Sequence, residues 1–215
     1  MLVDTERILE PYKDVSTNPE VHPGVAPAGL KRAFDVAVAG TGFAAVAPFI
    51  AFGALISFAA HGSNPFFTQE RVGLDGELFK IYKIKSLHFR TDEHGQPLPS
   101  EERRSWASTF LRASRIDELP QLLNVLEGTM SLVGPRPHIP EEAAGRAQVC
   151  LSVRPGMTGL AQVNGHNSLP DEAKFEYDRI YAENQHNGNQ LMNLLDDIRI
   201  LACSPAALIS NIFDP

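Results

Sequence analysis

The sequence is poor in the residues that build disulfide frameworks and transition-metal sites. Its 215 residues include two cysteines, Cys150 and Cys203, far apart and outside any Cys-x-x-Cys pattern. None of the seven histidines stands four residues from another, so no helix presents two imidazoles on one face. These absences exclude a disulfide scaffold and a zinc site, and leave reduced thiols and hard, oxygen-liganded metal ions.

Excess positive charge is also absent, since the formal net charge is −7. Proteins that bind nucleic acid usually neutralise its phosphates with a net-positive domain or a strong basic stripe, so we expect no nucleic-acid partner. The composition is otherwise close to that of globular proteins, and the length suits one compact domain with an appendage.

The N-terminal region divides into two parts. Residues 1–29 hold four prolines and charges of both signs, and lack the basic start and apolar run of a signal peptide, which predicts a flexible tail. Residues 30–62 contain a long apolar run and are expected to associate with a membrane. The remainder, 63–215, is expected to form the main compact domain.

The apolar run from Val36 to Ala60 contains no charged residue. As a helix it would extend about 37 Å, enough to cross a hydrocarbon core of about 30 Å, so a single transmembrane helix is one interpretation. Pro48 lies near its centre, where a missing backbone donor and a ring clash predict a kink.

The flanking charges favour a second interpretation. Lys31 and Arg32 precede the run, and further basic residues follow it, namely Arg71, Lys80, Lys83 and Lys85. Because positive charge is retained on the cytoplasmic side, both ends are drawn to the same face. We therefore favour a re-entrant helix that bends near Pro48 and leaves by the leaflet it entered.

The rest of the chain reads as a mixed α/β domain. Two extended runs joined at Asp75-Gly76 predict a hairpin, and a short strand is expected within 154–167. Helical patterns cover 100–114, where Ser100 is the expected cap, and 114–128, 170–184 and 190–208.

Asp117 and Glu118 are adjacent carboxylates at the start of a helix, with Pro120 tolerated in its first turn. The amides and dipole of a helix N-terminus favour an ionised carboxylate and bound phosphate. Two carboxylates also suit Mg²⁺ when a substrate supplies phosphate oxygens. The structural alternative is an ordinary acidic cap, because Ser114 with Asp117 resembles a capping box.

Two arginines lie in stiff turns. Arg136 stands between Pro135 and Pro137, which would direct its guanidinium toward a phosphate for bidentate binding. Arg154 precedes Pro155 in a similar setting. For each, a structural turn with a surface arginine is the alternative.

Two motifs are similar to those of a known family. The segments RIDELPQLLNVLEGTMSLVGPRP (115–137) and RPGMTGLAQVNG (154–165) closely resemble the monotopic phosphoglycosyl transferases among the bacterial sugar transferases. Segments 31–39, 67–86 and 197–201 and the Asp178-x-x-Tyr181 pair add to the resemblance. It implies a small mixed α/β catalytic domain on the cytoplasmic face of the inner membrane, with a re-entrant helix and amphipathic interfacial helices.

The resemblance also implies a reaction. Asp117 would attack the β-phosphorus of a UDP-sugar, UMP would leave, and polyprenyl (undecaprenyl) phosphate would accept the sugar phosphate, initiating exopolysaccharide or another surface glycan. Glu118 completes the dyad, either binding Mg²⁺ with Asp117 or helping to deprotonate the lipid phosphate. Basic residues are expected to bind the substrate, namely Lys83, Lys85, Arg112, Arg136 and Arg154.

Other functions remain open from the sequence. A catalytically silent membrane module that recruits glycan-assembly proteins and a metal-dependent phosphohydrolase would both retain similar segments. Galactose, glucose and N-acetylated sugars are all candidate donors, because no residue can be tied to a sugar hydroxyl. A second copy of the chain and downstream glycosyltransferases are further candidate partners.

Overall fold

The computed structural model describes residues 29–88, 93, 98–99, 102–143, 148–165 and 169–213. The expected tail, 1–29, lies outside the described residues except for Gly29, which begins the first helix.

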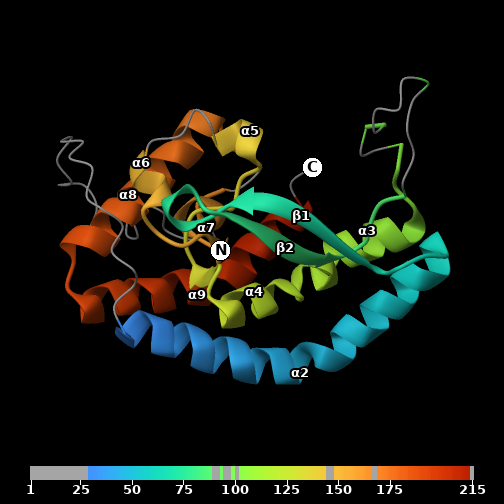
Figure 1. The fold of residues 1–215 in the computed structure, drawn as a ribbon, viewed down its shortest axis with the longest axis horizontal. Helices are drawn as coiled ribbons and strands as arrows, with labels where there is room; N and C mark the ends of the chain where they lie inside the picture. Colours follow the sequence, from blue (N-terminus) through green and yellow to red (C-terminus); the bar gives the residue numbers. More distant parts are fainter. Residues whose placement is uncertain are drawn as a thin grey trace.

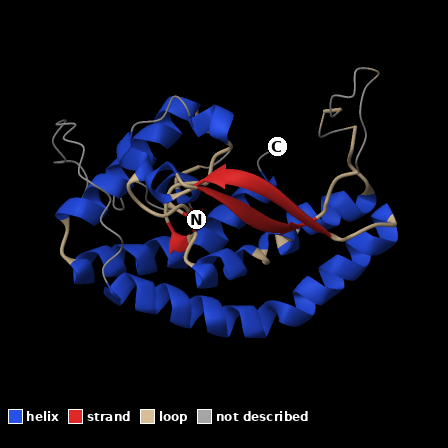
Figure 2. Cartoon of the chain, viewed as in Figure 1, coloured by secondary structure: helices blue, strands red, loops and turns tan. Residues whose placement is uncertain are grey.

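The fold is mixed α/β, as predicted, with two small sheets among the helices (Figures 1 and 2). β1 (Phe66–Val72) and β2 (Leu78–Ile84) form an antiparallel hairpin, and β3 (Ser131–Val133) pairs in parallel with β4 (Gly156–Thr158). The α-helices are α2 (Gly29–His61), α3 (Trp106–Ala113), α4 (Gln121–Glu127), α5 (Pro140–Ala143), α6 (Gln148–Leu151), α7 (Leu160–Val163), α8 (Asp171–Asn187) and α9 (Gln190–Phe213).

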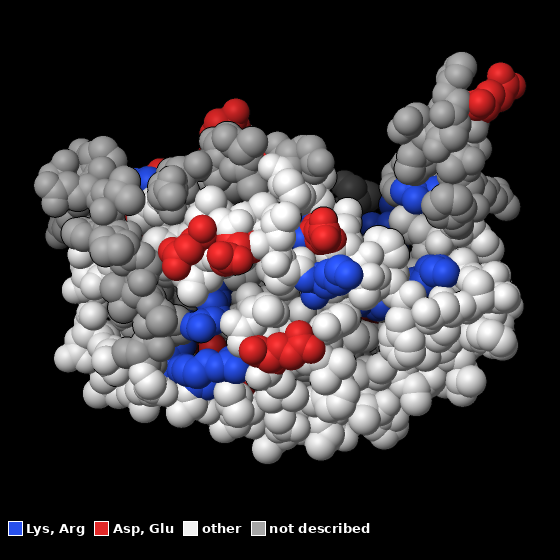
Figure 3. All heavy atoms as spheres, viewed as in Figure 1, with Lys and Arg blue, Asp and Glu red and all other residues white. Residues whose placement is uncertain are grey.

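Helix α2 runs along the lower edge of Figure 1 and bends upward in its second half. Pro48 lies inside the helix and explains the bend, because it removes a backbone hydrogen bond. Within the described residues, α2 is the one helix long and apolar enough to cross a membrane. Phe49, Phe52 and Leu55 are exposed on it, and the lower margin of Figure 3 carries no charged side chain. This composition is compatible with a membrane anchor.

Both halves of α2 pack against the same domain. The first half contributes the buried Ala39 to the main hydrophobic core. The second half contributes Ile50 to a smaller cluster and Gly53 to a close contact, where a Cβ would lie 2.5 Å from Cγ2 of Ile116. Near its end, Ser57 Oγ donates to the carbonyl oxygen of Lys85 at 2.6 Å.

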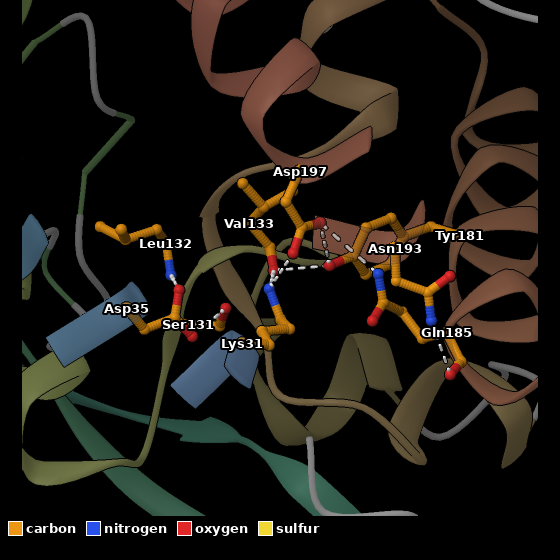
Figure 4. Close-up of polar contacts among 9 residues, drawn as sticks. All are labelled: Lys31, Asp35, Ser131, Leu132, Val133, Tyr181, Gln185, Asn193 and Asp197. Carbon is orange, nitrogen blue, oxygen red and sulfur yellow. Dashed lines mark hydrogen bonds and ion pairs between the residues drawn. The ribbon is translucent and has the colours of Figure 1, made fainter. Parts of the chain in front are cut away.

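A buried polar cluster joins the start of α2 to the domain (Figure 4). We call it the anchor cluster; its members are Lys31, Asp35, Ser131, Tyr181 and Asp197. Lys31 Nζ forms an ion pair with Asp197 and also donates to the carbonyl oxygen of Val133. The Tyr181 hydroxyl lies 2.8 Å from that carbonyl and 2.9 Å from Asp197 Oδ1. Asp35 accepts from Ser131 Oγ and from the Leu132 amide. These partners compensate the loss of water around buried polar groups.

The structure confirms some of the predicted turns and helix ends but not all of the predicted helix caps. The Asp75-Gly76 turn is confirmed, with φ of 55° and 84°, as is the helix end at Gly128, with φ of 90°. The predicted cap, Ser100, lies outside the described residues, and α3 begins at Trp106 behind a capping box of Ser105 and Ser108. The predicted capping box of Ser114 and Asp117 is wrong. Ser114 ends α3 and donates to the carbonyl oxygen of Phe110.

The anchor cluster leads to a stability prediction. Lys31→Met is expected to lower the free energy of unfolding by about 3 kcal/mol, because Asp197 is then buried without its cation. Adding Asp197→Leu should restore part of that loss. Unfolding of the purified protein in detergent measures both effects.

The matched control is Lys174→Met, which removes the ion pair with Asp171, whose side chain is 77% exposed. It should change the free energy of unfolding by less than about 1 kcal/mol. Equal losses in the Lys31 and Lys174 variants would contradict the role of the anchor cluster.

Candidate active site

The two predicted carboxylates lie on one turn of 3-10 helix, Ile116–Glu118, between α3 and α4. Arg115 precedes the turn in the left-handed region, with φ of 56°, a conformation that is unfavourable for a residue with a Cβ. Pro120 is the N-cap of α4, so it lies just before this helix and not in the first turn, where it was predicted. This local geometry separates the neighbours, since Asp117 is buried while Glu118 lines a cavity.

The cavity has a volume of about 250 Å³ and lies between both sheets and the helices α4, α7 and α9. One part of its lining is charged and consists of Arg71, Lys83, Arg115, Glu118 and Arg136. The other part is neutral and includes Gly156, Met157, Thr158, Gln162, Val163 and Ser204. A group of four cations around one carboxylate favours an anionic ligand such as a diphosphate.

Backbone contact fixes the neutral part of the lining. β3 and β4 approach so closely that a Cβ on Gly156 would overlap the backbone nitrogen of Gly134. A Cβ on Gly134 would likewise overlap the carbonyl oxygen of Arg154. Only glycine permits this distance, so Met157 and Thr158 are held in place beside the Gly-Pro-Arg-Pro turn.

Glu118 is strongly paired. Its Oε1 accepts from Lys83 Nζ at 2.8 Å and its Oε2 from Arg115 at 3.3 Å. Burial acts to raise the pKa of Glu118, but Lys83, Arg115 and Arg136 outweigh it and lower the pKa to about 2. Glu118 is therefore an anion that the surrounding cations stabilise.

Asp117 has the opposite environment. Its side chain is 7% exposed, Oδ2 lies 3.4 Å from Ser86 Oγ, and the buried Oδ1 has no hydrogen-bond partner. Burial, and then the charge of Glu118, raise the pKa of Asp117 to about 6, although Lys83, Arg112 and Arg115 oppose the shift. A carboxylate that folding leaves poorly solvated is a candidate for chemistry.

The structure brings together only some of the predicted substrate-binding residues. Lys83 and Arg136 line the cavity with Glu118, and Arg112 acts on Asp117 through its charge from α3. Lys85 lies elsewhere and donates to Ser63 Oγ at 3.1 Å.

The side chain of Arg154 does not reach the cavity. Its Nε donates to the carbonyl oxygen of Gly128 at 2.7 Å, and Arg32 donates to the carbonyl oxygens of Val125 and Leu126. Both arginines therefore lie at the C-terminal end of α4, where a cation is favourable.

Several lining residues were not predicted. Arg71 lies at the end of β1 and donates to the carbonyl oxygen of Pro137 and to Gln69. Its signal was its place in segment 67–86, one of the segments that carried the family resemblance. Gln121 and Gln162 likewise stand in the segments 115–137 and 154–165, which carried the resemblance, whereas Ser204 lies outside every such segment and meets the others only through tertiary packing.

Among the described residues there is no cluster of three or more His, Cys, Asp or Glu side chains that could hold a metal ion. The fit for Mg²⁺ therefore depends on the dyad. The buried Asp117 Oδ1 without a partner suits it, and a bound diphosphate would supply the remaining oxygen ligands. The donor set fits Mg²⁺ in the presence of such a ligand.

The chain belongs to the bacterial sugar transferase family, whose model matches residues 26–209. It is similar to the uncharacterised sugar transferase EpsL of Bacillus subtilis, with 41% identity over 72% of this chain and 78% of that protein. It is also similar to the UDP-glucose:undecaprenyl-phosphate glucose-1-phosphate transferase of Caulobacter vibrioides, with 38% identity over 87% and 73% of the two chains. The exopolysaccharide production protein ExoY of Rhizobium meliloti is 33% identical over 77% of this chain and 83% of its own.

Neutralising Asp117 and neutralising Glu118 are expected to change the free energy of unfolding in opposite directions. Asp117→Asn is expected to raise the free energy of unfolding at pH 7 by about 1–3 kcal/mol, because it removes a buried and unpaired charge. Glu118→Gln is expected to lower it, because Lys83 and Arg115 lose an anionic partner. Thermal unfolding in detergent measures both changes.

The effect of Asp117→Asn should depend on pH. The folded-state pKa of Asp117, about 6, lies above its ordinary value of 3.8, so the wild type is destabilised above pH 6 and recovers as the pH falls toward 4. The advantage of the Asn variant should shrink over the same interval. An Asn variant less stable than the wild type at pH 7 would contradict this account of the site.

Proposed function

We propose that the protein transfers a sugar 1-phosphate from a UDP-sugar to polyprenyl phosphate and releases UMP. The observation that carries the proposal is a buried carboxylate, Asp117, with one oxygen unpaired, next to a cavity that holds four cations. The names of the Caulobacter and Rhizobium relatives support this class of reaction and its place in exopolysaccharide synthesis.

Binding begins with the diphosphate of the UDP-sugar. Its oxygens compete with Glu118 for Lys83 and Arg115, while Arg71 and Arg136 contact it from the opposite strand and turn. Phosphate offers more acceptor oxygens than one carboxylate, so several charge-assisted hydrogen bonds can form at once. Glu118 is then released from its cations beside the reacting groups.

The chemical step is a displacement at the β-phosphorus. A carboxylate oxygen of Asp117 forms the new O–P bond, and the bond between this phosphorus and the oxygen of UMP breaks. An oxygen of polyprenyl phosphate then attacks the same phosphorus and displaces Asp117, which regenerates the carboxylate. Covalent catalysis divides one difficult transfer into two easier ones. With a pKa of about 6, Asp117 is mainly ionised at pH 7 and ready to react.

The surrounding groups stabilise the charge that moves during each displacement. The guanidinium and ammonium groups of the cavity neutralise the equatorial and leaving oxygens. Mg²⁺, held by Asp117 and Glu118 with the diphosphate, would supply further charge neutralisation. Glu118, once released from Lys83, can accept a proton from the lipid phosphate.

Helix α2 gives the site access to its lipid substrate. Contacts of both its ends with one domain, together with the bend at Pro48, support a re-entrant helix over a spanning one. The domain then stays on the cytoplasmic face of the inner membrane, at the level of the lipid phosphate. A second copy of the chain and downstream glycosyltransferases remain proposed partners.

The transferase proposal predicts UMP release before any lipid acceptor is added. The purified full-length protein, given a panel of UDP-sugars with Mg²⁺, should release about one UMP per active site and then continue only when polyprenyl phosphate is present. Asp117→Asn should abolish the release, and EDTA should suppress it. UMP is measured by chromatography.

Other outcomes separate the alternatives. Continuous formation of free sugar phosphate without lipid would identify a phosphohydrolase. No release from any donor would identify a silent module. Normal release by Asp117→Asn would refute the nucleophile.

The re-entrant topology has its own test. Both native cysteines are first removed by Cys150→Ala and Cys203→Ala. One cysteine is then introduced in each of two variants, Leu30→Cys near the start of α2 and Ser63→Cys just after its end. Neither should react with a membrane-impermeant maleimide in intact cells, and both should react after permeabilisation. Labelling of one position alone in intact cells would establish a spanning helix instead.

A further inference from the structure

The second half of α2 carries a hydroxyl group that faces the domain. Ser57 is fully buried, whereas Phe52 and Leu55 on the same half of the helix are exposed. Its Oγ donates to the carbonyl oxygen of Lys85 at 2.6 Å. Lys85 follows the last residue of β2, and its amide donates to the carbonyl oxygen of Pro65 at 2.7 Å. Both backbone groups of Lys85 are therefore bound, one by α2 and the other by the residue before β1.

The next residue along the chain reaches the candidate nucleophile. Ser86 Oγ donates to Oδ2 of Asp117 at 3.4 Å, and within the described part of the chain it is the one side chain that donates to this carboxylate. The last torsion of an aspartate side chain is soft, so a hydrogen bond to one oxygen restricts the direction of the carboxylate. We call Ser57, Lys85, Ser86 and Asp117 the positioning chain.

The same half of α2 also packs against the backbone that carries Asp117. A Cβ on Gly53 would lie 2.5 Å from Cγ2 of Ile116, the residue before Asp117. Ile50 belongs to a buried cluster that contains Ile84 and packs against Ile116. In Figure 1 this half of α2 rises beside α3. The backbone and the carboxylate of Asp117 thus both depend on the position of α2.

We propose that Ser86 is a positioning residue for Asp117, and that Ser57 of the long apolar helix holds Ser86 in place. The proposal rests on the transferase function and adds to it the part of the chain that orients the nucleophile. In a displacement at phosphorus the attacking oxygen lies roughly in line with the leaving oxygen, so a small rotation of the carboxylate slows the reaction. Helix α2 is thereby a component of the active site as well as a membrane anchor.

The test measures the burst of UMP from the purified full chain in nanodiscs, with a saturating UDP-sugar and no lipid acceptor. The amplitude of the burst counts folded sites, and its rate constant reports the attack by Asp117. Ser86→Ala should lower the rate constant about 10-fold to 100-fold, with the amplitude and the KM for the UDP-sugar unchanged. Ser86→Thr keeps the hydroxyl group and should restore most of the rate. A fall in amplitude at an unchanged rate constant would show a purely structural role and would overturn the proposal.

Ser57 is tested by the same burst. Ser57→Ala should lower the rate constant about 3-fold to 10-fold, because Lys85 loses one of its two backbone contacts. If Ser57 acts through Ser86, the double variant Ser57→Ala/Ser86→Ala should be no slower than Ser86→Ala alone. Losses that multiply in the double variant would show that the two serines act independently, and the positioning chain would be wrong.

Two hydroxyl groups that bind their own helices provide matched controls. Ser114, three residues before Asp117, donates to the carbonyl oxygen of Phe110, and Thr41, in the first half of α2, donates to that of Ala37. Ser114→Ala and Thr41→Ala should keep the rate constant of the wild type within about 2-fold. A control as slow as the alanine variants of the positioning chain would contradict the proposal.

Unfolding measurements separate this proposal from the transferase function, because they require no activity. The loss of stability caused by Ser86→Ala should be smaller in a chain that carries Asp117→Leu, where the hydroxyl group has no carboxylate to bind. Such coupling without UMP release from any donor would confirm the contact and refute the transferase. Absence of the coupling would overturn the positioning role, whatever the reaction is. Denaturant unfolding in detergent measures the coupling.

Discussion

The arrangement of the domain depends on a buried ion pair between the first turn of an apolar helix and the last long helix of the chain. Lys31 and Asp197 are far apart in the sequence, and between them they hold α2 against α9. The carbonyl of Val133 receives both Lys31 and Tyr181, so the same cluster fixes the end of β3. The next residues carry Arg136 into the cavity. The long apolar helix α2 is thereby connected to one of the cations that line the cavity.

Two adjacent carboxylates acquire different properties from this scaffold. The left-handed Arg115 and the following 3-10 turn direct Glu118 toward Lys83 and leave Asp117 buried. Glu118 is stabilised as an anion, whereas burial makes the ionised form of Asp117 less favourable. A difference of this kind is what allows neighbouring groups to take separate roles in one reaction.

Much of the fold could be predicted from local signals. The Asp75-Gly76 turn, the bend at Pro48 and the helix end at Gly128 each follow from backbone preferences of a few residues. The sequence also placed Asp117 and Glu118 near a helix start through Pro120, and they lie on a 3-10 turn just before α4. Arg154 was assigned to the substrate because an arginine in a turn has the same local sequence whether it faces a phosphate or a carbonyl. That Gln162 and Arg71 line the same cavity depends on packing between distant segments, which no local pattern encodes.

The close contact of β3 with β4 restricts how the protein can evolve. Gly134 and Gly156 leave no space for a side chain, so neither position can accept another residue unless the two strands move apart. Any relative that retains both glycines inherits the same rigid wall. Changes in donor preference would then have to arise by exchanging side chains at positions such as Met157, or in loops that border the opening. The paired backbones of β3 and β4 would stay the same while the side chains around them change.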